Sequence, residues 1–404
     1  MSNEILQQFK RITPRRVARS ILYRTHDVRY SLRLSASWRG QTPRVYLNSY
    51  LPNPIWDTYK THPPLRYAPY PVAEVCHWVT AVKLSSALPS WRAKRHIYEI
   101  EHMLILPEQL KMRPGDRPMC DWHRVFDDYD LSNEFVAREE CQTVLTFSAG
   151  LIEHFKQFLR PELWPKLDYV YPAYPEQPEC ERSADEPFTI LVIASRFSDK
   201  GVPEALRAYR ALRERHGARV RMILVSQAVP ENYQLPEGVI HHNIPRMSQE
   251  FKAQVYRSSD VLLLPNYGET AACFPEAYAF GVPVVTTRIH HGDEFVREGV
   301  TGYLLETPIF AFSEKFGSYW KDAQEFQNHL VRMRERGELD AIVAQAVDRL
   351  DAMITGQADI QAMRRAARQF HAECFSPGVR NRKLLSLYDA AAKRSSGERL
   401  NVES

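Results

Sequence analysis

Hydrophobic and polar positions alternate with two different periods along this chain, and the mixture predicts an α/β protein. Residues 28–34 alternate between apolar and polar side chains, which is typical of a strand, and residues 15–23 before them have the spacing of a short helix. Further strands are predicted at 44–47, 72–78, 97–100 and 143–147, with helical stretches between several of them. The first half is therefore predicted to be an α/β domain.

A segment rich in proline and acidic residues, 175–187 (PEQPECERSADEP), is predicted to be a linker, because neither helix nor sheet tolerates proline at that spacing. Beyond it, strands are predicted at 189–195, 221–226, near Val239, 261–264 and 282–286, and helices at 203–216, 249–258 and 275–280. This alternation predicts a parallel, doubly wound sheet. Helical stretches are expected after Pro308, and a disordered tail is expected at 396–404.

The composition excludes several classes of protein. The 404 residues are 44% hydrophobic and 25% charged, as in an ordinary globular chain, and every apolar run falls short of the roughly 20 residues that cross a bilayer. The first residues lack the apolar core of a secretory signal, so a cytoplasmic location is expected. The six cysteines are scattered singly, and the pairs His241-His242 and His290-His291 lack the spacing of a helical metal site. No metal and no disulfide framework are predicted.

Positive charge is concentrated at the beginning of the chain, where residues 1–40 hold nine basic and two acidic residues. Residues 10–24 combine arginines with apolar side chains, a combination that can rest on an anionic membrane surface. A solvated basic face of the first domain is an equally open interpretation. Nucleic-acid binding is disfavoured, because no aromatic residues are interleaved with the basic ones in a known module.

Two loops that follow predicted strands carry candidate chemistry, since ligands of open parallel sheets bind at the carboxyl ends of strands. Arg196 and Lys200 precede Gly201 and a helix, and such cations suit a diphosphate. In the second loop, Glu269 and Glu276 are carboxylates of the kind that accept hydrogen bonds from sugar hydroxyls. The alternatives are that the cations are solvated and that Glu276 only complements a helix dipole.

The combined motifs resemble the retaining, nucleotide-sugar-dependent glycosyltransferases of family four, which have the GT-B fold of two facing Rossmann-like domains. The resemblance covers residues 188–305 and includes VIASRFSDKGVPEAL, SSDVLLLPNYGET, PEAYAFGVPVVTT and EGVTGYLL. By this resemblance, Arg196 and Lys200 hold the donor diphosphate. Glu269 meets the donor sugar, and Glu276 meets the nucleotide ribose. The sugar and phosphate are approached by the backbone amides of Thr270, Ala271 and Ala272.

The chain departs from the family pattern in three places. The paired glutamates are separated by six residues instead of seven, Arg196 and Lys200 by three instead of four, and the glycine-rich loop of the first domain is missing. In the first domain, the family often places a histidine or an acidic residue facing the donor at a strand end. Glu101 and His102 are rival candidates for that position, because adjacent residues of a strand face opposite sides.

The resemblance implies a domain organisation and a function. An acceptor-side domain is expected at 1–184, joined by a C-terminal helix at about 378–395, and a nucleotide-sugar-binding domain at 185–377. The expected reaction transfers a hexosyl or deoxyhexosyl unit, with retention, from a nucleotide-sugar to a glycan, lipid-linked or other acceptor, without a metal or further cofactor. The departures leave one alternative, a catalytically silent GT-B protein that binds or regulates a partner.

Overall fold

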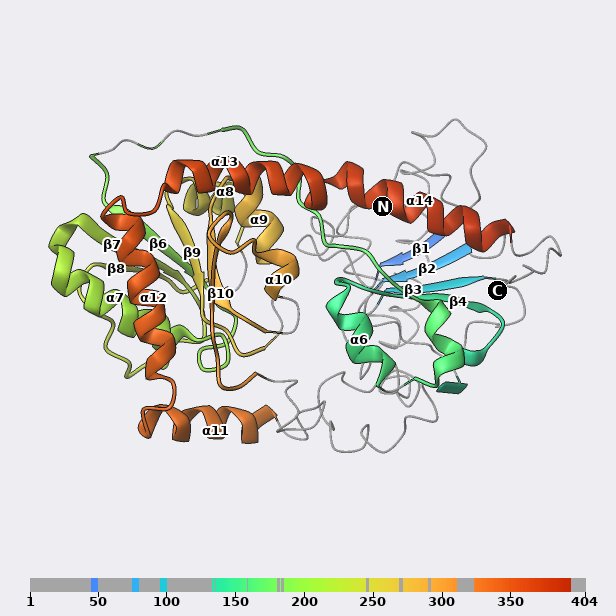
Figure 1. The fold of residues 1–404 in the computed structure, drawn as a ribbon, viewed down its shortest axis with the longest axis horizontal. Coiled ribbons are helices and arrows are strands. Elements are labelled where there is room, and N and C mark those ends of the chain that lie inside the picture. The colour runs from blue at the N-terminus through green and yellow to red at the C-terminus, as the bar shows by residue number, and fades with distance from the viewer. Residues whose placement is uncertain are drawn as a thin grey trace, which may run out of the picture.

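The structure is a computed structural model of the chain, in which two parallel β-sheets stand side by side with helices packed around them (Figure 1). The described residues are 45–49, 75–79, 95–99, 133–134, 136–157, 159–179, 182, 185–244, 247–268, 272–289, 292–310 and 323–393. The predicted helix at 15–23, the strand at 28–34, the basic segment 10–24 and the tail 396–404 lie outside these residues. Within them, every helix is too short or too polar to cross a membrane. The predicted α/β class is confirmed.

The first sheet has five parallel strands in the order β1-β2-β3-β4-β5. Its strands are β1 (Val45–Ser49), β2 (Val75–Val79), β3 (His96–Glu99), β4 (Cys141–Thr146) and β5 (Leu167–Tyr169). The first four lie where the sequence predicts strands. The fifth was not predicted, because three residues are too few to display an alternating period.

The second sheet has six parallel strands in the order β11-β10-β9-β6-β7-β8. They are β6 (Phe188–Ile193), β7 (Val220–Val225), β8 (Val239–His242), β9 (Val261–Leu264), β10 (Val284–Thr287) and β11 (Gly302–Leu305). The chain starts in the middle with β6, builds outwards to β8, and returns to add β9 on the other side. The prediction of a doubly wound sheet is therefore confirmed, and its strand order reverses between β6 and β9.

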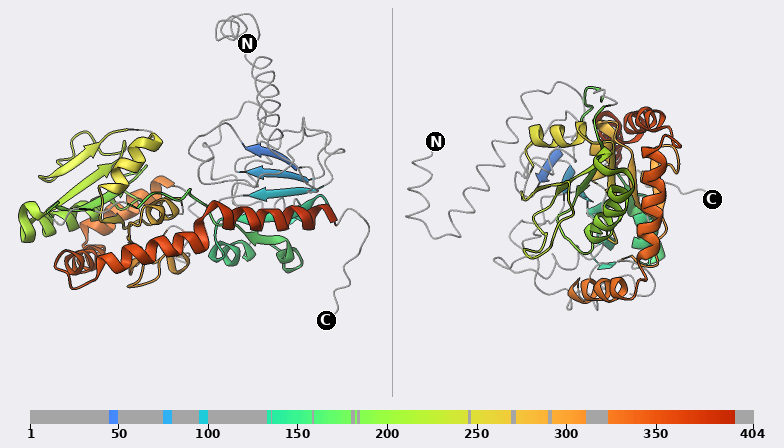
Figure 2. Two further views of the ribbon diagram at one scale, coloured as in Figure 1. Left: turned by 90° about the horizontal axis from the view of Figure 1, so that it is seen from above. Right: turned by 90° about the vertical axis from the view of Figure 1, so that its left-hand side faces the viewer.

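Helices cover both faces of the second sheet (Figures 1 and 2). They are α7 (Val202–His216), α8 (Gln249–Arg257), α9 (Cys273–Ala279), α10 (Gly292–Phe295), α11 (Ala323–Glu335), α12 (Asp340–Ile354) and α13 (Ile360–Phe370). Along β9, Val261 and Leu263 pack into a core shared with α7, α11 and α12, whereas Leu262 and Leu264 pack into a core shared with α8, α9 and α10. Burial on both faces explains why this strand is a continuous apolar run.

Helix α14 (Pro377–Lys393) connects the second sheet back to the first (Figure 1). It follows α13 after a short π-helical turn, His371–Phe375, and the two helices extend along both sheets (Figure 2). Leu384 and Tyr388 of α14 are buried with Ile97 and Leu145 of the first sheet. Among the described residues around that sheet, helix α6 spans Gly150–Lys156 and a short 3-10 helix spans Pro161–Lys166.

A buried ion pair fastens α14 to the carboxyl end of β3. The Nη2 atom of Arg380 donates to both carboxylate oxygens of Glu99, at 3.0 and 2.8 Å, and both side chains are almost fully buried. The Nη1 atom of Arg380 donates to the backbone oxygens of Val170 and Tyr171. One guanidinium therefore joins the crossing helix, β3 and the chain that leaves the first sheet.

Replacing Arg380 by alanine is expected to destabilise the protein by about 3–5 kcal/mol, because the Glu99 carboxylate is then left buried without its counter-charge. Urea unfolding followed by circular dichroism measures the loss. Lys383→Ala is the matched control on the same helix, since its ion pair with Asp168 is about one-third exposed and is worth less than about 1 kcal/mol. Equal, small losses in the two variants would contradict the expectation.

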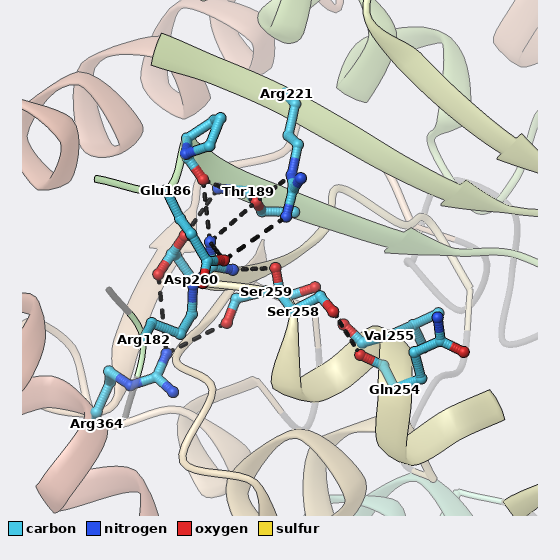
Figure 3. Close-up of polar contacts among 11 residues, drawn as sticks. Arg182, Glu186, Thr189, Arg221, Gln254, Val255, Ser258, Ser259, Asp260 and Arg364 are labelled. Carbon is cyan, nitrogen blue, oxygen red and sulfur yellow. Dashed lines mark hydrogen bonds and ion pairs between the residues drawn. The ribbon is translucent and has the colours of Figure 1, made fainter. Parts of the chain in front are cut away.

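A second charged cluster holds the amino-terminal end of β6 (Figure 3). The carboxylate of Asp260 accepts a hydrogen bond from the Thr189 backbone N–H at 2.8 Å and lies 3.4 Å from Nη1 of Arg182 and 4.0 Å from Nη1 of Arg364. Burial raises the pKa of Asp260, and the nearby arginines oppose that rise. Because ligands of such sheets bind at the opposite, carboxyl end, this cluster is structural: it ties the incoming chain and α13 to the sheet.

Candidate functional site

The candidate site lies where the strand order of the second sheet reverses, at the carboxyl ends of β6 and β9. Two loops begin there, which we name the β6 loop (residues 196–201) and the β9 loop (residues 265–272). The β6 loop carries the predicted diphosphate-binding residues, and it runs directly into α7. In the β9 loop, the structure describes residues 265–268 and Ala272.

The two loops pack against each other through their backbones. The N–H of Tyr267 donates to the backbone oxygen of Asp199 at 2.9 Å. Gly201 has a φ of 67°, and a Cβ atom at this position would overlap the carbonyl oxygen of Pro265. Glycine is therefore required here for two reasons, the left-handed backbone conformation and the close approach of the β9 loop.

The half-exposed side chain of Arg196 is held by the buried carboxylate of Asp199. Its Nε atom donates to Oδ2 of Asp199, whose side chain is buried, while the Arg196 side chain is 53% exposed. Within the described part of the chain, the Asp199 carboxylate is the partner of this guanidinium, so both terminal nitrogens remain available to an anion. The sequence pointed to Arg196, but the role of Asp199 was missed. The two residues are three positions apart in one loop, and this spacing could have indicated an ion pair between them.

Lys200 lies deeper than Arg196, with only 9% of its surface exposed. Its positive charge acts on Cys273, the first residue of α9. Burial raises the pKa of that thiol to about 12, Glu276 adds to the rise, and the positive charges of Lys200 and Lys252 oppose it. The Cys273 thiol is therefore neutral at physiological pH.

Glu276 is buried in the first turn of α9, and residues of α8 hold its carboxylate. Lys252 forms an ion pair with Oε1, and the Tyr256 hydroxyl donates to Oε2 at 2.9 Å. The Lys252 ammonium also lies 6.0 Å from the ring centroid of Tyr174. The role predicted for Glu276 stays a prediction.

The helix that carries Glu276 begins two residues before the predicted start, at Cys273 instead of Pro275. Ala272 precedes it as the N-cap residue. The first backbone N–H groups of a helix have no intrahelical partner, so proline at the third position loses no hydrogen bond and does not mark the start. The contacts of Lys252 and Tyr256 with Glu276 were not predicted. Their four-residue spacing places both on one face of a helix, but it does not show which residue that face contacts.

Five of the predicted site residues lie outside the described residues: Glu269, Thr270 and Ala271 of the β9 loop, and Glu101 and His102 after β3. Their predicted roles are therefore untested. The neighbouring Glu99 is described, and its carboxylate is engaged by Arg380.

Opposite the second sheet, the carboxyl end of β4 meets helix α10. Both carboxylate oxygens of Glu294 accept hydrogen bonds from the backbone that follows β4. Oε2 accepts from the Ala149 N–H at 2.8 Å, and Oε1 accepts from the Gly150 N–H. The Tyr171 hydroxyl donates to Oε2 at 3.0 Å, and burial, followed by the charge of Glu294, raises the pKa of Tyr171. The carboxyl ends of the two sheets therefore face each other across this contact.

Two parallel α/β sheets with facing carboxyl ends, joined by a linker and by a returning C-terminal helix, define the GT-B fold. A family model described as "Glycosyl transferases group 1" matches residues 188–322, which include β6 to β11 and both loops of the candidate site. The predicted GT-B fold is confirmed, and the sequence similarity to glycosyltransferases is located in the second sheet and its helices.

Solved structures of glycosyltransferases and related proteins are similar to this chain at low sequence identity. The GtfA/B complex is 12% identical with a TM-score of 0.51, over 79% of this chain and 57% of that chain. The match therefore spans little more than half the length of the GtfA/B chain. Anabaena HepE in complex with UDP-glucose is 15% identical with a TM-score of 0.47, over 79% of each chain. The lipopolysaccharide outer core galactosyltransferase WaaB is 12% identical with a TM-score of 0.45, over 74% of this chain and 75% of that chain. No curated protein sequence matches.

Proposed function

We propose that this protein is a glycosyltransferase that binds a nucleotide-sugar at the carboxyl ends of β6 and β9. It transfers a hexosyl or deoxyhexosyl unit, with retention of anomeric configuration, to a glycan, lipid-linked or other acceptor held on the side of the first sheet. The observation that carries the proposal is the packing of the β6 loop, which contains Arg196 and Lys200, against the β9 loop that leads into α9. This packing lies at the strand-order reversal, within the segment similar to group 1 glycosyltransferases.

The proposed chemistry requires stabilisation of a leaving diphosphate. Negative charge develops on its bridging oxygen as the glycosidic bond breaks, and preorganised cations lower the energy of that state. Arg196 offers two terminal nitrogens on a guanidinium held by Asp199, and Lys200 supplies a point charge from a largely buried position. The backbone amides of Thr270, Ala271 and Ala272 are proposed to approach the sugar and phosphate, with Glu269 meeting the donor sugar and Glu276 the ribose.

The acceptor side is proposed to contribute either Glu101 or His102. Both follow β3, whose carboxyl end lies in the sheet that faces the donor loops. Glu101→Gln and His102→Asn test them separately, since only the substitution of the residue that faces the donor should affect turnover.

We expect transfer to be independent of divalent metal, because Arg196 and Lys200 supply the positive charge that a metal would otherwise provide. Dialysis against EDTA should leave the initial rate within about twofold of the untreated enzyme. Adding Mg²⁺ or Mn²⁺ back should not increase it. A rate that collapses with EDTA and returns with one of these ions would contradict the expectation.

The second candidate function is a catalytically silent GT-B protein, which the shorter spacing of the two glutamates and the missing glycine-rich loop of the first domain favour. Titration calorimetry with UDP-, GDP-, dTDP- and ADP-sugars, followed by a hydrolysis and transfer assay of every donor that binds, distinguishes the two. Binding with turnover supports the glycosyltransferase, binding without turnover supports the silent protein, and no binding of any donor contradicts both.

A further inference from the structure

Arg334, near the end of α11, makes four hydrogen bonds around the β6 loop. Its Nη1 and Nη2 atoms donate to the hydroxyl and the backbone oxygen of Ser198, both at 2.6 Å. Its Nε and Nη2 atoms donate to the carboxylate of Glu204, at 2.6 and 3.2 Å. The guanidinium therefore bridges the centre of the β6 loop and the first turn of α7.

These contacts are largely shielded from water. The Glu204 side chain is fully buried and the Arg334 side chain is 14% exposed. The guanidinium also lies 5.9 Å from the ring centroid of Tyr267 in the β9 loop, whose N–H donates to the backbone of Asp199. Arg334 thus contacts each of the three parts that frame the cations: the β6 loop, the start of α7 and the β9 loop.

The position of Ser198 explains why this anchor matters for binding. Ser198 lies midway between Arg196 and Lys200, so its backbone sets where both cations lie. The rigid fork of the Arg334 guanidinium holds both the hydroxyl and the backbone oxygen of Ser198, which fixes the centre of the loop. A lysine has a single nitrogen, which cannot reproduce the same set of bonds.

We propose that Arg334 is a positioning residue for diphosphate binding: it holds the β6 loop so that Arg196 and Lys200 are directed at the donor before it arrives. The inference rests on the proposed function. Arg334 lies beyond residues 188–322, the segment similar to the glycosyltransferase family, so the similarity itself does not assign this role.

The test measures binding of nucleoside diphosphate by titration calorimetry, using the nucleotide of the donor that binds best in the screen above. In Arg334→Lys, which keeps a positive charge beside Glu204, the dissociation constant should rise by about 10- to 30-fold. The KM for the donor should rise with it. Arg336→Lys is the matched control, because Arg336 lies nearby in an exposed pair with Glu338, and it should remain within about twofold.

A double-mutant cycle separates positioning from a general structural effect. If Arg334 acts through the cations, Arg334→Lys should weaken binding by less than about threefold in a chain that already carries Arg196→Ala or Lys200→Ala. Should Arg334→Lys fail to fold, Ser198→Ala removes only one of the four acceptors and should still weaken binding by about three- to fivefold.

The outcomes distinguish the inference from the function on which it rests. If the wild-type protein binds no nucleoside diphosphate, the proposed function is wrong and the inference falls with it. If the wild type binds but folded Arg334→Lys and Ser198→Ala bind equally well, only the inference is overturned. Losses that are the same with and without Arg196 and Lys200 would overturn it too, since they would show that Arg334 supports the fold alone.

Discussion

Lys200→Ala should lower the turnover number for sugar transfer by about 100-fold or more at saturating donor, which corresponds to about 3 kcal/mol of transition-state stabilisation. Lys200 is only 9% exposed, and surrounding protein screens a charge less than water does. Its effect on a developing diphosphate charge should therefore be large. Initial rates at several donor concentrations separate this loss of turnover from weaker binding.

Lys156→Ala serves as the control for Lys200. Its ammonium is paired with Glu153 on the surface of α6, so removing it should change the rate by less than about twofold. Near-normal transfer by folded Lys200→Ala would show that this lysine does not stabilise the leaving group. The assignment of the β6 loop as the diphosphate site would then depend on Arg196 alone.

Glu276→Ala should lower the free energy of unfolding by about 3–5 kcal/mol, as large a loss as that expected for Arg380→Ala. The ion pair of Glu276 with Lys252 is buried, with 1% and 3% of the two side chains exposed. Removing the carboxylate leaves the ammonium buried without its counter-charge and removes the acceptor of the Tyr256 hydroxyl. Urea unfolding measures the loss, and Asp340→Ala, which breaks the exposed pair with Arg207, is the control.

A double variant tests whether Glu276 also meets the ribose. Replacing both members of the pair, as Lys252→Met with Glu276→Leu, removes the uncompensated charge and should recover most of the stability. If the carboxylate contacts the ribose, affinity for the nucleotide should stay reduced by about 10-fold relative to Lys252→Met alone. Recovery of both stability and affinity would show that Glu276 is a structural partner of Lys252 and nothing more.

The sequence predicted five of the six strands of the second sheet and missed β11. It placed β9 at its observed bounds and the start of α7 within one residue, since both depend on periodicity and on glycine and proline nearby in the chain. It also located the β6 and β9 loops, because the end of an apolar run marks the end of a strand. The three-residue strand β5 was missed, since so short a segment displays no period.

The contacts of the charged residues were decided by tertiary structure. Arg196, Lys200 and Glu276 were visible in the sequence, but their surroundings were not: Lys252 comes from another helix, and Arg334 lies 136 residues from Ser198. Periodicity and turn chemistry are properties of consecutive residues, so the sequence alone determined the elements and the loops between them. Which charge is buried, which is exposed, and which arginine holds the β6 loop depend on how distant elements pack, because burial and ion pairing arise only when the fold brings them together.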